Sequence, residues 1–149
     1  MIQRRDESRG FIRKKVVEYN KQKLSSAVKT PLEEIAFVIE EEDEVVGGIS
    51  ATLFWQHLHI DFLWVTDEKR GDGVGRKLLQ QVERLADEKE CRLILLDTFS
   101  FQAPGFYLKE GYEICGKVEN HPQGHTQYFL QKNLASALSA SSLVVREWD

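Results

Sequence analysis

The sequence is poor in cysteine, and it contains no long apolar run. Its two cysteines, Cys91 and Cys115, are too few and too far apart for a disulfide framework or a thiolate metal site. We expect both to be small buried side chains in a reducing compartment. No stretch is long and apolar enough to cross a membrane, and the first ten residues lack the apolar centre of a secretory signal. These absences predict a cytoplasmic protein with no membrane partner.

The chain also lacks a strong excess of charge of either sign. It has 20 Lys and Arg against 24 Asp and Glu, a net charge of −4. Residues 1–24 hold eight of the basic residues and three of the acidic ones, so the remainder is acidic. A mildly acidic body argues against a nucleic-acid partner. We expect the basic segment to be the solvated face of a helix.

The length of 149 residues and the ordinary share of hydrophobic residues, 42%, predict a single domain that needs no metal to fold. We place this domain at residues 1–134. Residues 135–149 are rich in small side chains, and we expect them to form a tail that docks through Leu143, Val144 and Trp148.

Hydrophobic periodicity predicts a mixed α/β layer structure. Helices are expected at residues 8–24, 74–89 and 103–110. Strands are expected at residues 35–40, 45–56, 57–66, 91–98, 112–119 and 126–133. The acidic run at 40–44 is expected to be a hairpin turn, and Gly47-Gly48 a bulge or a close backbone approach. This order of elements predicts a sheet with helices packed on it.

The clearest chemical signal is a glycine-rich turn between the third strand and the helix at 74–89. It reads Arg70-Gly71-Asp72-Gly73-Val74-Gly75-Arg76-Lys77. Glycines let the backbone approach a ligand closely, and N–H groups at a helix N-terminus carry partial positive charge. The three cations disfavour the helix slightly unless a polyanion binds there. The turn therefore predicts a phosphate or pyrophosphate site.

Spacing alone leaves the ligand open. The turn lacks the Walker pattern, and Arg76 stands where a dinucleotide fingerprint needs its third glycine. Asp97, at the end of the next strand, keeps a nucleotide-binding interpretation open because such folds place a ribose-binding acid there. A glycine-rich turn without any ligand is a further alternative.

Two segments of the chain match one family in order. Arg70, Gly73 and Gly75 fit a loop of Arg or Gln, two residues, Gly, one residue, and Gly or Ala. A second segment is matched by Ala103, Phe106, Tyr107, Gly111 and Tyr112. On these motifs the chain resembles the GNAT superfamily of acetyl-CoA-dependent N-acetyltransferases, over about residues 8–134. The resemblance implies a mixed, mostly antiparallel sheet that is splayed in a V, with helices on both faces.

The resemblance also implies a binding site for acetyl-CoA. The pyrophosphate is expected at the backbone of Gly71, Asp72, Gly73, Val74, Gly75 and Arg76, beside Arg70. The pantetheine arm is expected along Leu63, Trp64 and Val65, whose N–H groups would polarise the thioester carbonyl. Further cofactor contacts are expected from Ser100, Ala103 and Phe106, and Ser100 stands where the family often has Asn. No metal is expected, because His57, His59, His121 and His125 form no compact ligand motif.

By the same resemblance, Tyr107 is the general acid that protonates the CoA thiolate; the alternative is a core aromatic beside Phe106. His59 and Asp61 are candidates for the general base, and the alternative is a polar cluster whose groups satisfy one another. Strand alternation predicts that His57, His59 and Asp61 share a face with Leu63 and Val65.

The expected reaction is direct acetyl transfer in a ternary complex to a primary amine of a small molecule or peptide. A non-catalytic acyl-CoA-binding or regulatory module of the same fold is the alternative. Residues 19–35 and 119–126 are expected to set specificity. A homodimer is plausible, because the tail and the late strands offer apolar edges.

Overall fold

The computed structural model describes residues 1–26 and 31–134. The predicted tail, with Leu143, Val144 and Trp148, lies outside the described residues, as does part of the predicted specificity segment 19–35. The helices are η1 (Asp6–Ser8), α1 (Arg9–Lys23), η2 (Asp67–Lys69), α2 (Val74–Glu88) and α3 (Pro104–Lys109). The strands are β1 (Glu33–Glu41), β2 (Glu44–Phe54), β3 (His57–Val65), β4 (Leu93–Phe99), β5 (Glu113–Glu119) and β6 (Thr126–Asn133). Every predicted helix and strand is confirmed, with its ends within two residues.

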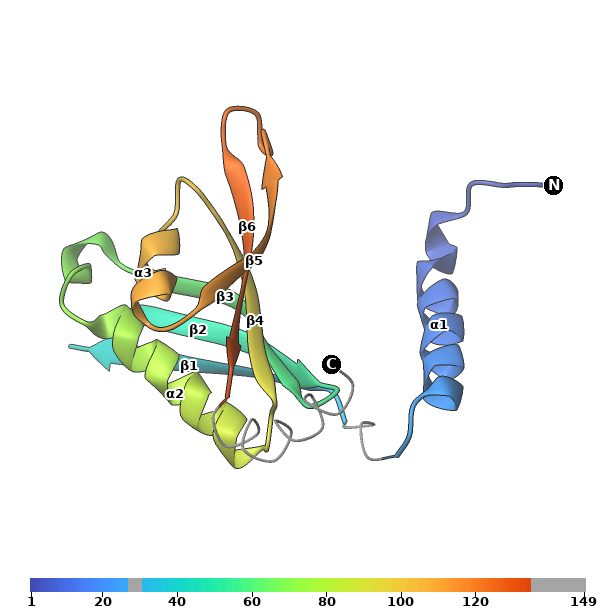
Figure 1. The fold of residues 1–149 in the computed structure, drawn as a ribbon, viewed down its shortest axis with the longest axis horizontal. Helices are drawn as coiled ribbons and strands as arrows, with labels where there is room; N and C mark the ends of the chain where they lie inside the picture. Colours follow the sequence, from blue (N-terminus) through green and yellow to red (C-terminus); the bar gives the residue numbers. More distant parts are fainter. Residues whose placement is uncertain (27–30, 135–149) are drawn as a thin grey trace, which may run out of the picture.

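The six strands form one sheet in the order β1-β2-β3-β4-β6-β5 (Figure 1). Neighbouring strands run antiparallel except β3 and β4, which run parallel. This confirms the mixed, mostly antiparallel fold class. The predicted hairpin at 40–44 joins β1 to β2, with Glu42 and Asp43 at positive φ. No helix in the described part of the chain is long and apolar enough to span a membrane.

The pairing between β3 and β4 is short. It joins residues 57–59 to residues 93–95 and then stops. β4 continues to Phe99 along β6 instead, while β3 continues to Val65 along β2. The two strands therefore diverge beyond His59, as the V-shaped sheet predicts, and their facing backbone groups have no strand partner there (Figure 1).

A bulge in β3 changes which side chains face the core. Ala51 of β2 pairs with Ile60 and Ser50 pairs with Phe62, so Asp61 is an extra residue. Because side chains alternate along a strand, one extra residue reverses the pattern after it. The prediction that Leu63 and Val65 share a face with His57, His59 and Asp61 is therefore wrong. Both pack against the core that contains Leu58 and Ile60.

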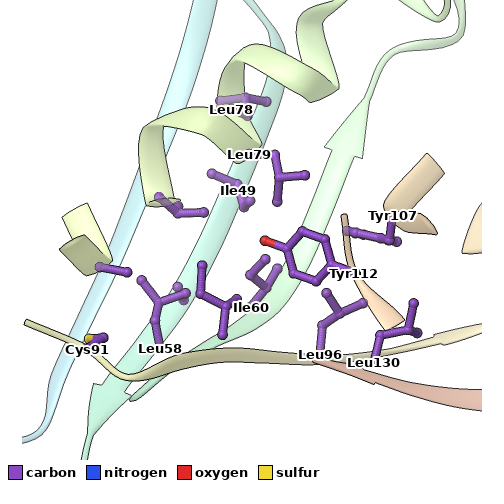
Figure 2. Packing of buried hydrophobic residues seen from close by; sticks show 14 of the residues in the cluster. Ile49, Leu58, Ile60, Leu78, Leu79, Cys91, Leu96, Tyr107, Tyr112 and Leu130 are labelled. Atoms are coloured by element: carbon purple, nitrogen blue, oxygen red, sulfur yellow. The ribbon is translucent and has the colours of Figure 1, made fainter. Parts of the chain in front are cut away.

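That core lies between the sheet and α2 (Figure 2). An apolar stripe of α2 is buried at Val74, Leu78, Val82 and Ala86. It packs on inward-facing residues of the strands, among them Leu58 and Ile94, which are fully buried. Burial of this kind contributes roughly 1.5–3 kcal/mol for each large aliphatic side chain.

The opposite face of the sheet carries no helix in the described residues. Residues that pair directly across β1, β2 and β3 define it, and we call this surface the open face: Ala36, Val38, Ser50, Thr52, His59, Phe62 and Trp64. α2 contacts β1 to β4 on the core side, α3 contacts β5, and the Phe106 ring of α3 lies beside Gly75 at the start of α2.

Helix α1 stands apart from the sheet, and none of its residues is buried (Figure 1). The expected solvated basic helix is present, but its apolar side is exposed as well. Of the cysteines, Cys91 is buried as predicted, whereas Cys115 is exposed. The prediction for Cys115 is wrong because it lies on the outermost strand β5, where its Sγ donates to the Phe129 carbonyl (3.4 Å).

The close approach predicted at Gly47 supplies a stability test. A Cβ there would lie 2.8 Å from Val74 Cγ1 and 3.2 Å from the Trp64 carbonyl oxygen. We expect Gly47→Ala to lower the free energy of unfolding by about 1–3 kcal/mol in urea titrations, because the β-branched Val74 has little freedom to move.

Gly105→Ala is the control, since nothing lies within 4 Å of its Cβ position. Equal stability of the two variants would show that contact between β2 and α2 is looser than described.

Candidate functional site

The predicted anion-binding turn forms the N-terminus of α2. Gly71 and Gly73 adopt positive φ (87° and 83°), a conformation that strains any residue with a side chain. The first backbone bond of the helix runs from the Lys77 N–H to the Gly73 carbonyl (3.0 Å). The N–H groups of residues 74–76 therefore precede the helical ladder, and no side chain caps them. They present a row of donors at the positive end of the helix.

Close packing fixes this turn beside the end of β3. Val74 is buried over Gly47, and an added Cβ on Gly75 would lie 3.5 Å from the Phe106 ring and 3.7 Å from Val65. Phe106 belongs to the second motif segment, on α3. The two motif segments, about 30 residues apart in sequence, thus meet at one point next to the diverging strands.

The cations of the turn are partly neutralised by the protein itself. Arg70 Nε lies 3.3 Å from Asp67 and donates to the Val65 carbonyl (3.4 Å). Arg76 Nε pairs with Glu110 at 3.1 Å. Both side chains remain largely exposed, so an anion with more charge than one carboxylate can compete for them.

Tyr107 is buried among aromatic rings, with 8% of its surface exposed (Figure 2). Its ring meets Phe106 and Tyr112 edge-on, at centroid distances of 5.1 and 5.8 Å. In the described part of the chain no group bonds its hydroxyl, yet every buried side-chain polar atom there has a hydrogen-bond partner. The hydroxyl is therefore not buried, although its ring is enclosed. Burial raises the pKa of Tyr107 to about 12, which keeps the phenol protonated at neutral pH.

Tyr112, the last residue of the second segment, has a supporting position. Its hydroxyl donates to Glu83 of α2 (2.9 Å), and Lys132 of β6 donates to the same carboxylate oxygen (3.0 Å). Burial, followed by the Glu83 charge, raises the pKa of Tyr112. This network holds the chain after α3 against α2 and so fixes the Tyr107 ring from behind.

A polar triad lies on the open face. His59 Nδ1 is 2.9 Å from Asp61 Oδ1, and Thr52 Oγ1 donates to Asp61 Oδ2 (2.6 Å). The bulge turns Asp61 toward both partners. His57 is separate: its ring bonds the Phe54 carbonyl, and burial lowers its pKa. Thr52 was missed in the sequence, since a lone threonine on a strand gives no signal of its own.

The triad borders a hollow of about 670 Å³. Besides His59 and Asp61, its lining includes two further carboxylates, Glu34 of β1 and Asp97 of β4. Asp97 accepts from Gln127 Nε2 (3.0 Å). Its lining includes residues of both β3 and β4, so the hollow extends across the space between the diverging strands, which we call the gap. The hollow adjoins this gap on the open face, whereas the anion-binding turn lies on the core side.

Comparison with known proteins identifies the family. Residues 5–112 match the family model described as Acetyltransferase (GNAT) family. The chain belongs to this family. As an acetyltransferase of the GNAT family it shares 39% identity with the blasticidin-S acetyltransferase of Streptomyces morookaense, over 70% of this chain and 78% of that protein.

Two solved structures show the same GNAT fold. A crystal structure of an acetyltransferase from Bacillus cereus ATCC 14579 is 47% identical and covers 90% of this chain and 96% of its own, with a TM-score of 0.87. A putative streptothricin acetyltransferase from Bacillus anthracis, solved in complex with acetyl coenzyme A, is 22% identical over 70% of this chain and 64% of its own, with a TM-score of 0.62.

The structure brings together only some of the residues predicted for the GNAT site. The turn at 70–76, Val65 and Phe106 lie together at the start of α2. Trp64 points to the open face and is half exposed, so only its backbone faces the diverging strands. Ser100 Oγ accepts from the Thr126 N–H (3.0 Å), and Ala103 precedes α3 as its cap.

Among the described residues no three His, Cys, Asp or Glu side chains gather as a metal site. The rings of His121 and His125 lie against Phe99 and Phe101.

The raised pKa of Tyr107 predicts a pH dependence of stability. Its pKa is about 10 in the unfolded chain and about 12 in the folded one, so its stabilising contribution is complete below pH 10 and is lost as the pH rises toward 12. We expect the free energy of unfolding of the wild type to fall faster than that of Tyr107→Phe over this range, by about 1.4 kcal/mol per pH unit. Urea titrations at a series of alkaline pH values measure the difference, and parallel curves would contradict it.

Proposed function

We propose that the protein transfers the acetyl group of acetyl-CoA directly to a primary amine of a small molecule or peptide, in a ternary complex and without a metal. The observation that carries the proposal is the gap between β3 and β4. An anion-binding turn and a protonated tyrosine flank it on the core side, and an acidic hollow with a histidine adjoins it on the open face. The core side, with its anion-binding turn, suits the cofactor, and the open face, with its acidic hollow, suits an amine.

The residues of the turn fit the diphosphate of acetyl-CoA. Its donors are the N–H groups of residues 74–76, joined by the backbone of Gly71, Asp72 and Gly73, and Arg70 and Arg76 supply exposed cations. Beyond His59 the edge of β3 has unpaired backbone groups. A pantetheine arm along Leu63, Trp64 and Val65 would bond to them much as a neighbouring strand does. This arrangement would bring the thioester into the gap, with the acetyl group toward the hollow.

His59 has the surroundings of a general base. Asp61 is oriented by Thr52 and accepts a hydrogen bond from His59 Nδ1 when the imidazole is neutral. That arrangement assigns the proton to Nδ1 and leaves Nε2 as the acceptor. As the amine nitrogen attacks the carbonyl carbon, Nε2 takes the proton that the nitrogen releases, directly or through one water.

We place Tyr107 at the core side of the same gap, because it belongs to the buried cluster that contains Ile60 of β3 and Leu96 of β4. When the carbon–sulfur bond breaks, its hydroxyl donates to the departing sulfur. Its pKa of about 12 keeps the phenol protonated, so the hydroxyl is a hydrogen-bond donor to the sulfur as negative charge develops there, and the tyrosine recovers from solvent the proton that it passes to the thiolate. Holding the amine and the thioester together in one gap supplies much of the rate.

The negative charges around the hollow indicate which class of amine the site would accept. Three carboxylates, Glu34, Asp61 and Asp97, border the hollow. They favour an amine that carries a second positive charge elsewhere. Blasticidin S is the first acceptor to test, because the chain is 39% identical to an acetyltransferase named for it; an aminoglycoside and a lysine peptide complete the panel.

Removal of the Tyr107 hydroxyl tests the acid role. We expect Tyr107→Phe to lower kcat by roughly a hundredfold, because general acid catalysis contributes about 10²–10⁴. Its affinity for acetyl-CoA, measured by calorimetry, should stay within about twofold. Tyr128→Phe, on β6, is the control and should keep kcat. An undiminished kcat in Tyr107→Phe would remove this residue from the mechanism, and an acyl-CoA-binding protein that transfers to no amine would support a regulatory module instead.

Replacement of the proposed base tests its role. We expect His59→Gln to lower kcat by roughly a hundredfold, because general base catalysis contributes about 10²–10⁴. Its affinity for acetyl-CoA, measured by calorimetry, should stay within about twofold. His125→Gln, in the turn between β5 and β6, is the control and should keep kcat. If His59→Gln keeps full kcat, another group, or water, takes the proton.

A further inference from the structure

Helix α1 has an apolar stripe with nothing to cover it. Ile12, Val16 and Tyr19 fall on one side of the helix, and each exposes between 53 and 59% of its surface. An isolated helix of 15 residues is marginal in water, because tertiary packing supplies most helical stability. A helix of this length with an exposed stripe therefore requires a surface to pack on.

The open face of the sheet is a surface that lacks a helix. Phe62 is 78% exposed there, and Val38 and Trp64 expose more than half of their surfaces. A flat apolar patch on a sheet is normally covered by a helix in α/β proteins. The stripe and the open face are thus two unpaired apolar surfaces of the same chain.

Their charges are complementary. Residues 1–24 carry eight Lys and Arg against three Asp and Glu. The open face is bordered by carboxylates, among them Glu34, Glu40, Asp61 and Asp97. A basic helix and an acidic rim attract each other and fix the orientation of docking.

We propose that α1 of one copy docks on the open face of a second copy, so that two chains exchange their N-terminal helices. Within one chain, α1 stands away from the sheet (Figure 1). A symmetric exchange covers both stripes and both open faces at once.

The exchange would complete the acceptor site. The hollow beside His59 and Asp61 lies on the open face, so the partner's helix would form its outer wall. This consequence rests on the proposed function, but the exchange itself does not. Tests of assembly therefore need no activity, and failure of one proposal leaves the other standing.

Molar mass measured by light scattering during size exclusion tests the assembly. The wild type should have twice the 17.2 kDa of one chain at micromolar concentration. Val16→Gln, in the centre of the stripe, and Val38→Gln, on the open face, should each weaken the dimer by at least roughly tenfold, because each removes apolar contact twice. Lys21→Gln, on the far side of α1, and Val118→Gln, on β5, are the matched controls and should leave it intact. A monomeric wild type, or a dimer that only Val118→Gln dissociates, would overturn the proposal.

A cross-link between copies tests the exchange itself. A carbodiimide should join a lysine on the stripe side of α1, such as Lys23, whose Nζ lies over the Tyr19 ring, to Glu34 or Glu40 on the rim of the open face. In a dimer assembled from equal amounts of ¹⁴N- and ¹⁵N-labelled chains, about half of these cross-links should join peptides of different labels, as random pairing of two copies requires. Cross-links that join only peptides of the same label would show that α1 folds back on its own chain, and no cross-link would show that α1 covers neither face. Either result overturns the exchange.

Discussion

The hydrogen bonds between β3 and β4 stop after His59 and Leu95, and the arrangement of the site depends on where they stop. Before this point the two strands form an ordinary parallel pair at the centre of the sheet. Beyond it their backbone groups face a gap. Two constraints keep it open. The bulge at Asp61 bends β3 within its pairing to β2, and β4 remains bonded to β6 as far as Phe99.

Two glycines, which have no side chain of their own, allow the anion-binding turn to lie close to this gap. Gly47 lets Val74 reach the sheet, and Gly75 lets Phe106 cover the start of α2. A side chain at Gly47 would displace Val74 and with it the helix N-terminus, whereas a Cβ at Gly75 would make ordinary contact with Phe106 and Val65. The same two contacts join the core, the turn and the second motif segment, so stability and cofactor binding depend on shared atoms. Substitutions at these positions should seldom separate the two properties.

The sequence predicts the elements well because their signals are local. Strand alternation, the stripe of α2 and the glycine-rich turn each lie within a short window. The failures come from effects that such a window does not contain. The period of two could not place Leu63 and Val65, because it assumes an unbroken pleat and the bulge at Asp61 breaks it. The exposure of Cys115 depends on β5 being the last strand of the sheet. The partnership of Thr52 with Asp61 depends on the register between strands.

Amide hydrogen exchange with and without acetyl-CoA tests the central claim most directly, since exchange reports the bonding of individual N–H groups. The account predicts slower exchange at residues 71–76 and at residues 63–65 when acetyl-CoA is saturating. It predicts little change at residues 57–59, whose backbone is already paired. Protection confined to other segments, or none while calorimetry reports binding, would contradict a cofactor site between the turn and the diverging strands.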